Sequence, residues 1–315
     1  MKRIIGFFLL IALLSCNSSF DFETALRQKY TVDEDGDPVI ENVENTDIHT
    51  LGAAGGFCYG FNLPEAEIAS IDTEIDFPSQ YDLSDFLPPV GSQGKQGSCV
   101  AWATGYYLKS FHENYEDNLN GNSANDNRMS PAFIFNQIKA SGCDNGSVVQ
   151  RALDTLNSSG IPDWTVMPYD ENNCDLQPSD LQKNLAKPNK IVSYFYLNQD
   201  LVYEQTKAFL LNDQPVVIAI AIDRSYFGAR DENGIYVYRK FKESSGGHAM
   251  LVVGYDDDMN AFKVVNSWGK SWGNNGFVWI DYKAFMEAGD ANSEFNVLCE
   301  AWITNDIIIS QPGSL

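Results

Sequence analysis

The chain has 315 residues, of which 44% are hydrophobic and 13% aromatic, enough for one large or two small globular units. Its formal net charge of -22, from 21 basic and 43 acidic residues, rules against a protein that binds a nucleic-acid backbone, because such contacts need clustered Lys and Arg. Beyond the N-terminus, no apolar run approaches the length of a membrane span.

Residues 1–15 have the features of a signal peptide. A short basic start precedes an apolar run from Ile4 to Leu14 that is too short to span a bilayer as a mature helix. Ser15 and Cys16 follow, and this pair resembles the lipobox of bacterial lipoproteins, in which the cysteine is acylated. The resemblance implies lipidation at Cys16 and an exported lipoprotein at the outer membrane or cell surface of a bacterium. The alternative is an ordinary secretory signal with an incidental cysteine.

Residues 16–75 are predicted to be a lipidated tether or a short prosegment. They carry many Asp, Glu, Asn and Gly with few periodic apolar positions, so we expect little regular structure there. A single folded domain is expected over 76–315. Its helical part is expected over about 76–188 and its β part over about 189–315.

The first part of this domain is predicted to be helical. A Gly-rich, turn-like stretch leads into a helix over 99–115, where apolar residues recur at helical spacing and Cys99 lies in the first turn. Two further helices are predicted over 130–140 and 148–160, the second closed by Gly160.

The second part is predicted to be a largely antiparallel sheet or barrel. Short runs rich in β-branched and aromatic residues are separated by Gly, Asn and Asp turns. They cover 190–197, 215–222, 234–239, 248–256, 261–268, 276–282 and 297–303, with one helix over 201–212. The fold class is therefore α+β with two packed parts, and the groove between them is the expected place for a site.

Cys99 is the candidate nucleophile. Thiols attack as thiolates, so a catalytic cysteine needs a helix N-terminus or a histidine beside it. The helix start supplies the first. Of the three histidines, His112 lies on the same helix roughly 20 Å from Cys99, and His49 lies in the acidic flank. His248, at the start of a predicted strand, remains as the base.

Two further residues complete a candidate acyl-transfer site. Imidazole beside a thiolate must be oriented by a third group, and Asn266 ends the strand that is expected to pair with the strand of His248. The oxyanion needs donors, for which the backbone N–H of Cys99 and the side-chain amide of Gln93 are suited.

Three sequence segments resemble the papain-like cysteine peptidase family. They are PVGSQGKQGSCVAWA around Gln93 and Cys99, GGHAMLVVGYD around His248, and NSWGKSWGNNGFVWI from Asn266. The separation of cysteine and histidine fits the same family, and the resemblance spans residues 76 to about 303. It implies a cysteine endopeptidase that works through a Cys99, His248 and Asn266 triad and a thioester acyl-enzyme, with Gln93 as oxyanion donor.

The resemblance also implies substrate-binding residues. Trp268 would cover the bond between histidine and asparagine, and Trp272 would line the groove on the leaving-group side. Asn145 and Gly146 would bind the substrate backbone through their main chain, and Gly247 would border a side-chain pocket. One departure is Val100, which stands where the family usually has Trp.

The cysteine pattern also departs from the family. The resemblance implies two bridges, but their first positions are Gln96 and Gln137 here, which leaves Cys143 and Cys174 as surviving halves. We expect these two to join each other. Cys58 and Cys299 then pair by elimination.

We expect a monomer that needs no metal or cofactor. Its partner is a peptide or protein substrate, and it meets a membrane only through the N-terminal lipid. Two other functions compete with the endopeptidase. One is another Cys-His-Asn enzyme, either an aminopeptidase of the bleomycin-hydrolase branch or an amide transferase. The other is a degenerate, non-catalytic binding module.

Overall fold

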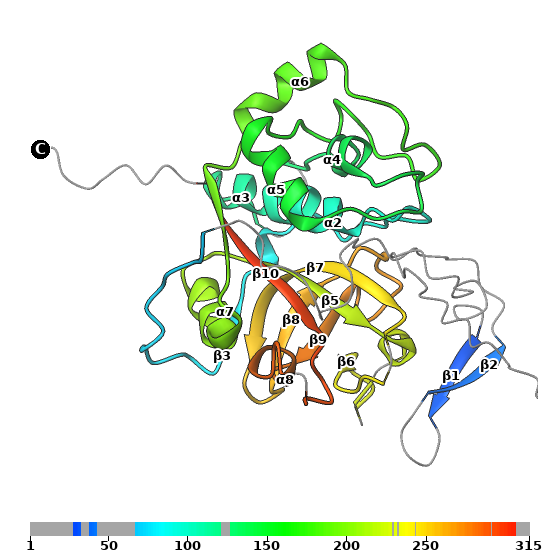
Figure 1. The fold of residues 1–315 in the computed structure, drawn as a ribbon, viewed down its shortest axis with the longest axis vertical. Coiled ribbons are helices and arrows are strands. Elements are labelled where there is room, and N and C mark those ends of the chain that lie inside the picture. The colour runs from blue at the N-terminus through cyan, green and yellow to red at the C-terminus, as the bar shows by residue number, and fades with distance from the viewer. Residues whose placement is uncertain are drawn as a thin grey trace, which may run out of the picture.

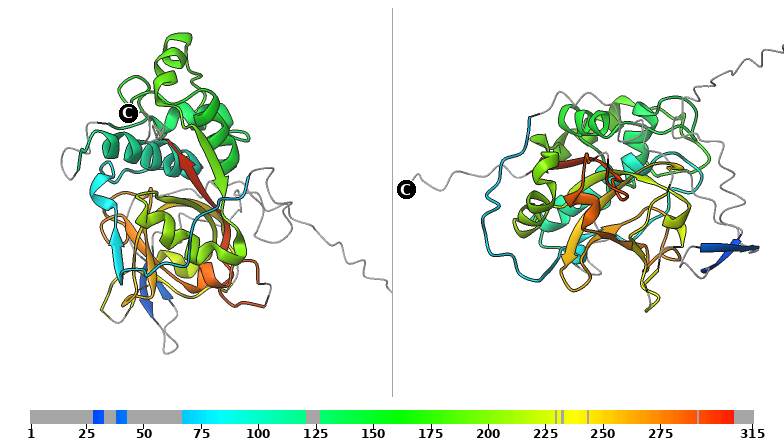
Figure 2. Two further views of the ribbon diagram at one scale, coloured as in Figure 1. Left: turned by 90° about the vertical axis from the view of Figure 1, so that its left-hand side faces the viewer. Right: turned by 60° about the horizontal axis from the view of Figure 1, so that its bottom comes forward.

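The computed structural model describes residues 67–120, 127–228, 230–231, 233–242, 244–290 and 292–306, and the backbone of 28–32 and 38–42. Two packed parts make up the fold, a group of helices and a large sheet (Figure 1). Figure 2 shows the same two parts from two further directions. The predicted signal peptide, Cys16 and Cys58 lie outside the described residues.

One long helical segment runs through the middle of the helical part. It consists of α2 (Cys99–Ala101), the π-helix η2 (Trp102–Lys109) and α3 (Ser110–Glu116), which follow one another without a break. The sequence predicted an ordinary α-helix here. Every residue of η2 is buried, so no polar face was available to reveal the wider period of a π-helix.

Three further helices belong to this part, of which the first two contact the long segment, and each has a recognisable start or end. α4 (Pro131–Ile138) begins at Ser130, whose hydroxyl accepts from the N–H of Phe133. α5 (Val149–Ser158) buries an apolar stripe and is followed by Gly160 at φ +76°, where a Cβ would lie 2.1 Å from the carbonyl oxygen of Ala186. α6 (Asp180–Ala186) begins with a capping box between Ser179 and Gln182.

The sheet has eight strands. Seven form a path in the order β4, β10, β5, β7, β8, β9, β6, and β3 pairs with β7 beside that path. The strands are β3 (Gln80–Asp82), β4 (Ser193–Tyr196), β5 (Val216–Ile222), β6 (Val237–Tyr238), β7 (Gly246–Asp256), β8 (Ala261–Val265), β9 (Phe277–Asp281) and β10 (Leu298–Asn305).

The shorter helical pieces complete the element list. They are η1 (Ser84–Phe86), η4 (Lys187–Asn189), η5 (Gln199–Leu201), α7 (Val202–Leu211), η6 (Arg224–Phe227) and α8 (Lys283–Met286). β5 is buried along its whole length, which is why it reads in sequence as a continuous apolar run rather than an alternating one.

The α+β class and the two-part architecture are confirmed. The barrel-like closure is not, because β4 and β6 end the path of the sheet without pairing with each other. The sheet is also mixed, since β6 pairs with β9 in the parallel sense while the other pairs are antiparallel. Alternating patterns identify the faces of strands but do not determine whether the edges of a sheet meet.

The N-terminal flank differs from its prediction in two respects. β1 (Gln28–Val32) and β2 (Pro38–Asn42) pair antiparallel where little regular structure was expected. The chain also contacts the sheet before the predicted start of the domain at residue 76, because the N–H of Ala69 donates to Tyr196 and the carbonyl of Ala69 accepts from Gln205. Within the described ranges, no helix combines the length and apolar character that crossing a bilayer requires.

Candidate active site

Cys99 lies at the first position of α2, where the helical part meets the sheet. Its sulfur accepts a hydrogen bond from the backbone N–H of Ala249 in β7, at 3.4 Å. Ala249 directly follows His248, so this contact places the thiol beside the strand segment that carries the histidine. Cys99 and His248 are both fully buried, with 0% exposure.

His248 and Asn266 form a direct hydrogen bond. The distance from Nε2 of His248 to Oδ1 of Asn266 is 2.8 Å. Since Nε2 faces the asparagine, Nδ1 is the ring nitrogen left to face the thiol. The two residues come from neighbouring strands, because β7 pairs with β8 and Asn266 directly follows β8.

Asn266 is itself held from several sides. Its Oδ1 also accepts from the N–H of Ser267 at 2.7 Å, and its N–H donates to Gly276 at 2.9 Å. Its carbonyl oxygen accepts from the hydroxyl of Tyr107 at 2.9 Å. Tyr107 belongs to the long helical segment, so this contact ties the nucleophile's helix to the orienting asparagine.

Aromatic rings cover the histidine. The Trp268 ring lies over that of His248 with centroids 4.7 Å apart, and Phe227 stacks on the far side of Trp268 at 5.3 Å. Tyr226 approaches His248 at 6.3 Å and stacks on Trp272 at 5.4 Å. This apolar surround keeps water from competing for the bond between His248 and Asn266.

Gln93 is fixed on the loop that leads into Cys99. Its side-chain oxygen accepts from the hydroxyl of Ser267 at 2.6 Å, and its amide nitrogen donates to the carbonyl of Gln96 at 2.8 Å. Ser267 was not predicted as a site residue, although it lies between Asn266 and Trp268 in the family-like segment that begins at Asn266.

Residues 143–146, called the substrate strip because they include the predicted substrate-binding residues Asn145 and Gly146, lie against the loop that leads into Cys99. The N–H of Gly97 donates to the carbonyl of Cys143 at 2.8 Å, and a Cβ on Gly97 would lie 2.7 Å from the carbonyl oxygen of Asp144. Only glycine allows this approach. Asn145 and Gly146, which follow on the strip, are therefore near the nucleophile loop, while Gly247 lies opposite Ala221 in the sheet.

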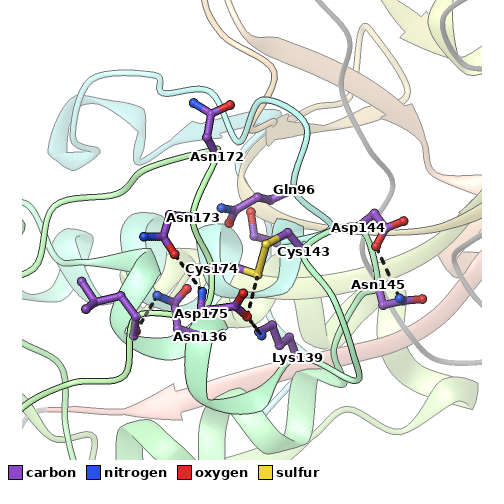
Figure 3. The surroundings of a disulfide bond; sticks show 12 residues. Gln96, Asn136, Lys139, Cys143, Asp144, Asn145, Asn172, Asn173, Cys174 and Asp175 are labelled. Atoms are coloured by element: carbon purple, nitrogen blue, oxygen red, sulfur yellow. Dashed lines mark hydrogen bonds and ion pairs between the residues drawn. A yellow bond between two sulfur atoms is a disulfide. The ribbon is translucent and has the colours of Figure 1, made fainter.

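A disulfide joins Cys143 to Cys174 beside the strip, with Cα atoms 5.5 Å apart. Figure 3 shows Gln96 next to this bond, at the position where the family resemblance implies a cysteine. The Gln96 side chain donates instead to the carbonyl of Asp170 at 2.7 Å. Cys299 is also disulfide-bonded, and its predicted partner Cys58 lies outside the described residues.

Comparisons with known proteins find relatives over most of the chain. The profile described as "Papain family cysteine protease" matches residues 77–296. A peptidase C1-like protein of Acanthamoeba polyphaga mimivirus is 26% identical over 254 residues, covering 75% of this chain and 76% of the viral protein. Cathepsin J of Mus musculus is 27% identical over 221 residues, covering 65% of this chain. The chain spans only 61% of the length of cathepsin J.

The fold has solved counterparts. The crystal structure of xylellain, a cysteine protease from Xylella fastidiosa, superposes with a TM-score of 0.64 at 24% identity, covering 80% of this chain and 96% of xylellain. At this identity the likeness shows the fold alone.

Proposed function

Because the chain belongs to the papain family of cysteine proteases, we propose that this hydrolase is an endopeptidase in which Cys99, His248 and Asn266 form the catalytic triad. The observation that carries the proposal is the chain of contacts from Ala249 N–H to the Cys99 sulfur and from His248 Nε2 to Asn266 Oδ1. These contacts support a site in which a thiol and an oriented imidazole lie side by side.

The proposed reaction has two steps. The Cys99 thiolate attacks the peptide carbonyl carbon, and His248 passes its proton to the leaving amine as the C–N bond breaks, which gives a thioester. Water then attacks the thioester while His248 takes its proton, which releases the acid and restores the thiolate beside the protonated histidine. The side-chain amide of Gln93 and the backbone N–H of Cys99 would stabilise the oxyanion in both steps.

Accessory roles follow from the same geometry. Trp268 would shield the His248–Asn266 bond, and Trp272 would line the leaving-group side. Asn145, Gly146 and Gly247 would contact the substrate backbone and a side-chain pocket. We expect a monomer that acts on peptides or proteins without a metal or cofactor.

A fluorogenic peptide assay tests the proposal. Cys99→Ala should abolish hydrolysis and labelling by an irreversible epoxide inhibitor, while its melting temperature stays within about a few degrees of the parent, because the change removes one buried sulfur. Residual peptidase activity in this variant would disprove the assignment. Cleavage of a long peptide only at its ends would identify an exopeptidase, and no cleavage at all would identify a binding module.

The predicted export is a separate proposal. The apolar run before Cys16 and the small residue preceding it support a lipid-anchored protein at the outer membrane or cell surface of a bacterium, with the domain beginning after a tether or short prosegment. Metabolic labelling with palmitate should mark the parent and not Cys16→Ser. Equal labelling of the two would favour an ordinary secretory signal.

A further inference from the structure

Tyr169 lies in the loop between α5 and α6, and its hydroxyl touches the nucleophile loop twice. It donates to the carbonyl oxygen of Gln93 at 2.8 Å, and it lies 2.6 Å from the hydroxyl of Ser98. Ser98 is the residue immediately before Cys99. One oxygen atom therefore contacts both ends of the stretch from Gln93 to Cys99.

This stretch carries both proposed oxyanion donors. One donor is the Gln93 side-chain amide, and the other is the N–H of the peptide bond between Ser98 and Cys99. Their separation and direction depend on how the stretch is folded, and small misplacements of such groups cost much of their effect. A bridge across its two ends is well placed to fix that geometry.

The polar groups of Gln93 are bonded to three residues, which are Ser267, Gln96 and Tyr169. Ser267 holds its side-chain oxygen, and the carbonyl of Ser267 accepts from the Gln93 N–H at 2.8 Å. Gln96 accepts from the side-chain nitrogen. The Gln93 carbonyl accepts weakly from the N–H of Gln96 at 3.4 Å, so the 2.8 Å bond from Tyr169 is its shorter contact.

Tyr169 is itself anchored on both sides. The carbonyl of Met167 accepts from the hydroxyl of Ser130, and the carbonyl of Asp170 accepts from the side chain of Gln96 at 2.7 Å. The Tyr169 ring packs edge-on against Trp102, with centroids 5.1 Å apart. Two backbone bonds and one ring contact thus hold the hydroxyl in place.

The hydroxyl also keeps its proton. Burial raises the pKa of Tyr169 well above its usual value of 10, although the bond to Ser98 acts in the opposite direction. Tyr169 therefore remains a hydrogen-bond donor to Gln93 across the pH range in which a thiol peptidase works.

We infer that Tyr169 is a positioning residue for the oxyanion donor Gln93, acting through the Gln93 backbone. The inference rests on the proposed function of Gln93 and adds a residue that does not itself touch the substrate. It predicts that Tyr169 contributes to acyl transfer through Gln93 and not through the reactivity of the thiol.

The first experiment compares two Tyr→Phe variants of the full chain. Tyr169→Phe removes only the bridging hydroxyl and should lower kcat roughly five- to fiftyfold with KM changed less than about twofold. These limits lie between the effect of one neutral hydrogen bond and that of a lost oxyanion donor. Tyr106→Phe is the matched control, because Tyr106 packs on the same Trp102 and donates to the carbonyl of Pro89. Its kcat should stay within about twofold of the parent.

Alkylation of Cys99 by iodoacetamide separates positioning from a general disturbance of the site. This reaction needs the thiolate but builds no oxyanion at a carbonyl, so its rate and pH profile should be unchanged in Tyr169→Phe. Slower alkylation in parallel with slower hydrolysis would overturn the inference. Unchanged hydrolysis in Tyr169→Phe would overturn it as well.

A double-mutant cycle tests the route through Gln93. In a Gln93→Ala background, Tyr169→Phe should lower kcat by less than about twofold, because the donor that it positions is gone. The same factor in both backgrounds would overturn the inference. If Tyr169→Phe does not fold, Ser98→Ala, which removes the other partner of the hydroxyl, should show a smaller loss of kcat with the same dependence on Gln93. A parent without Cys99-dependent hydrolysis would instead refute the proposed function itself.

Discussion

At the scale of single residues, the roles of His248 and Asn266 differ in kind. His248 is the proposed proton carrier, whereas Asn266 only orients it through one bond of 2.8 Å. The same Oδ1 of Asn266 also accepts from the N–H of Ser267, and the backbone N–H and carbonyl of Asn266 are bonded to Gly276 and Tyr107. The histidine ring is also held by Trp268. Loss of the asparagine therefore leaves the base in place but less well oriented.

We expect Asn266→Ala to lower kcat by about one to two orders of magnitude and His248→Ala by about two to four, as for the loss of a general acid–base. Asn274→Ala is the matched control, because both polar atoms of that side chain bond to the backbone of Tyr236. Its kcat should stay near that of the parent. An Asn266→Ala variant as inactive as His248→Ala would point to a role in holding the site together.

The residues that lie within motifs could be predicted from the sequence, and those that join distant segments could not. Cys99, His248, Asn266 and Gln93 are marked by their immediate neighbours, and the structure brings all four to one place. Tyr169 is 76 positions from Gln93. No local pattern distinguishes its hydroxyl from that of any other half-buried tyrosine.

At the scale of elements, the Cys143–Cys174 disulfide links the substrate strip to the loop before α6. It closes a loop with a sequence separation of 31. Around it, Lys139 forms an ion pair with Asp175 at 2.7 Å (Figure 3). The strip that carries Asn145 is thus fastened twice at Cys143, by the disulfide and by the bond from the N–H of Gly97 to the Cys143 carbonyl.

The double variant Cys143→Ser/Cys174→Ser should lower the free energy of unfolding by roughly 3 to 4 kcal/mol, as the chain-entropy account gives for a loop of this length. Because the strip is also loosened, KM should rise more than kcat falls. Denaturant unfolding and steady-state kinetics measure the two effects. Peptide mapping without reduction is the control, and unmodified thiols at both positions in the parent would contradict the bridge.

The helix α3 contains a buried histidine that is not part of the site. His112 bonds to the hydroxyl of Thr304 in β10 at 3.0 Å. Burial, and secondly the charge of Lys109, lowers the pKa of His112 from 6.5 to about 3. The unfolded chain takes up a proton at this residue well before the folded chain does. The destabilising effect of His112 is therefore absent above about pH 6.5 and grows as the pH falls towards 3.

The substitution His112→Gln should reduce the fall in the free energy of unfolding at acid pH. In the parent, His112 contributes a fall in the free energy of unfolding that approaches about 1.4 kcal/mol per pH unit between these two values. The glutamine side chain of the variant does not titrate and can still bond to Thr304. Burial raises the pKa values of the nearby Glu116 and Asp306, but both are present in each protein. Parallel curves of unfolding energy against pH would contradict the prediction.

At the scale of the whole molecule, buried polar contacts tie the helical part to the sheet. Lys109 in η2 pairs with Asp306, directly after β10, at 2.5 Å, and also with Glu113. On another side, the hydroxyls of Tyr81 in β3 and Tyr115 in α3 both donate to Asp213. These bonds hold the nucleophile's helix in a fixed relation to the strands that carry His248 and Asn266.

The complete burial of Cys99 and His248 bears on how the enzyme becomes active. With 0% exposure at both, a peptide can reach the sulfur only after part of the chain moves. We expect full-length protein to hydrolyse peptides without trimming, as a tether allows, whereas a lag that ends as N-terminal residues are removed would be the behaviour of a prosegment. N-terminal sequencing over the time course measures the trimming.

The position of β10 makes completion of the sheet depend on the order of synthesis. This last strand of the domain lies between β4 and β5 in the sheet, and the residue after it supplies the partner of Lys109. Until β10 has been made, β4 and β5 have no strand between them, and Lys109 in the long helical segment lacks the carboxylate of Asp306. Such a nascent chain cannot complete its sheet before β10 has been made, since the pairings that the sheet needs are distant in sequence. The order of translation thus postpones proteolysis until β10 has joined β4 and β5.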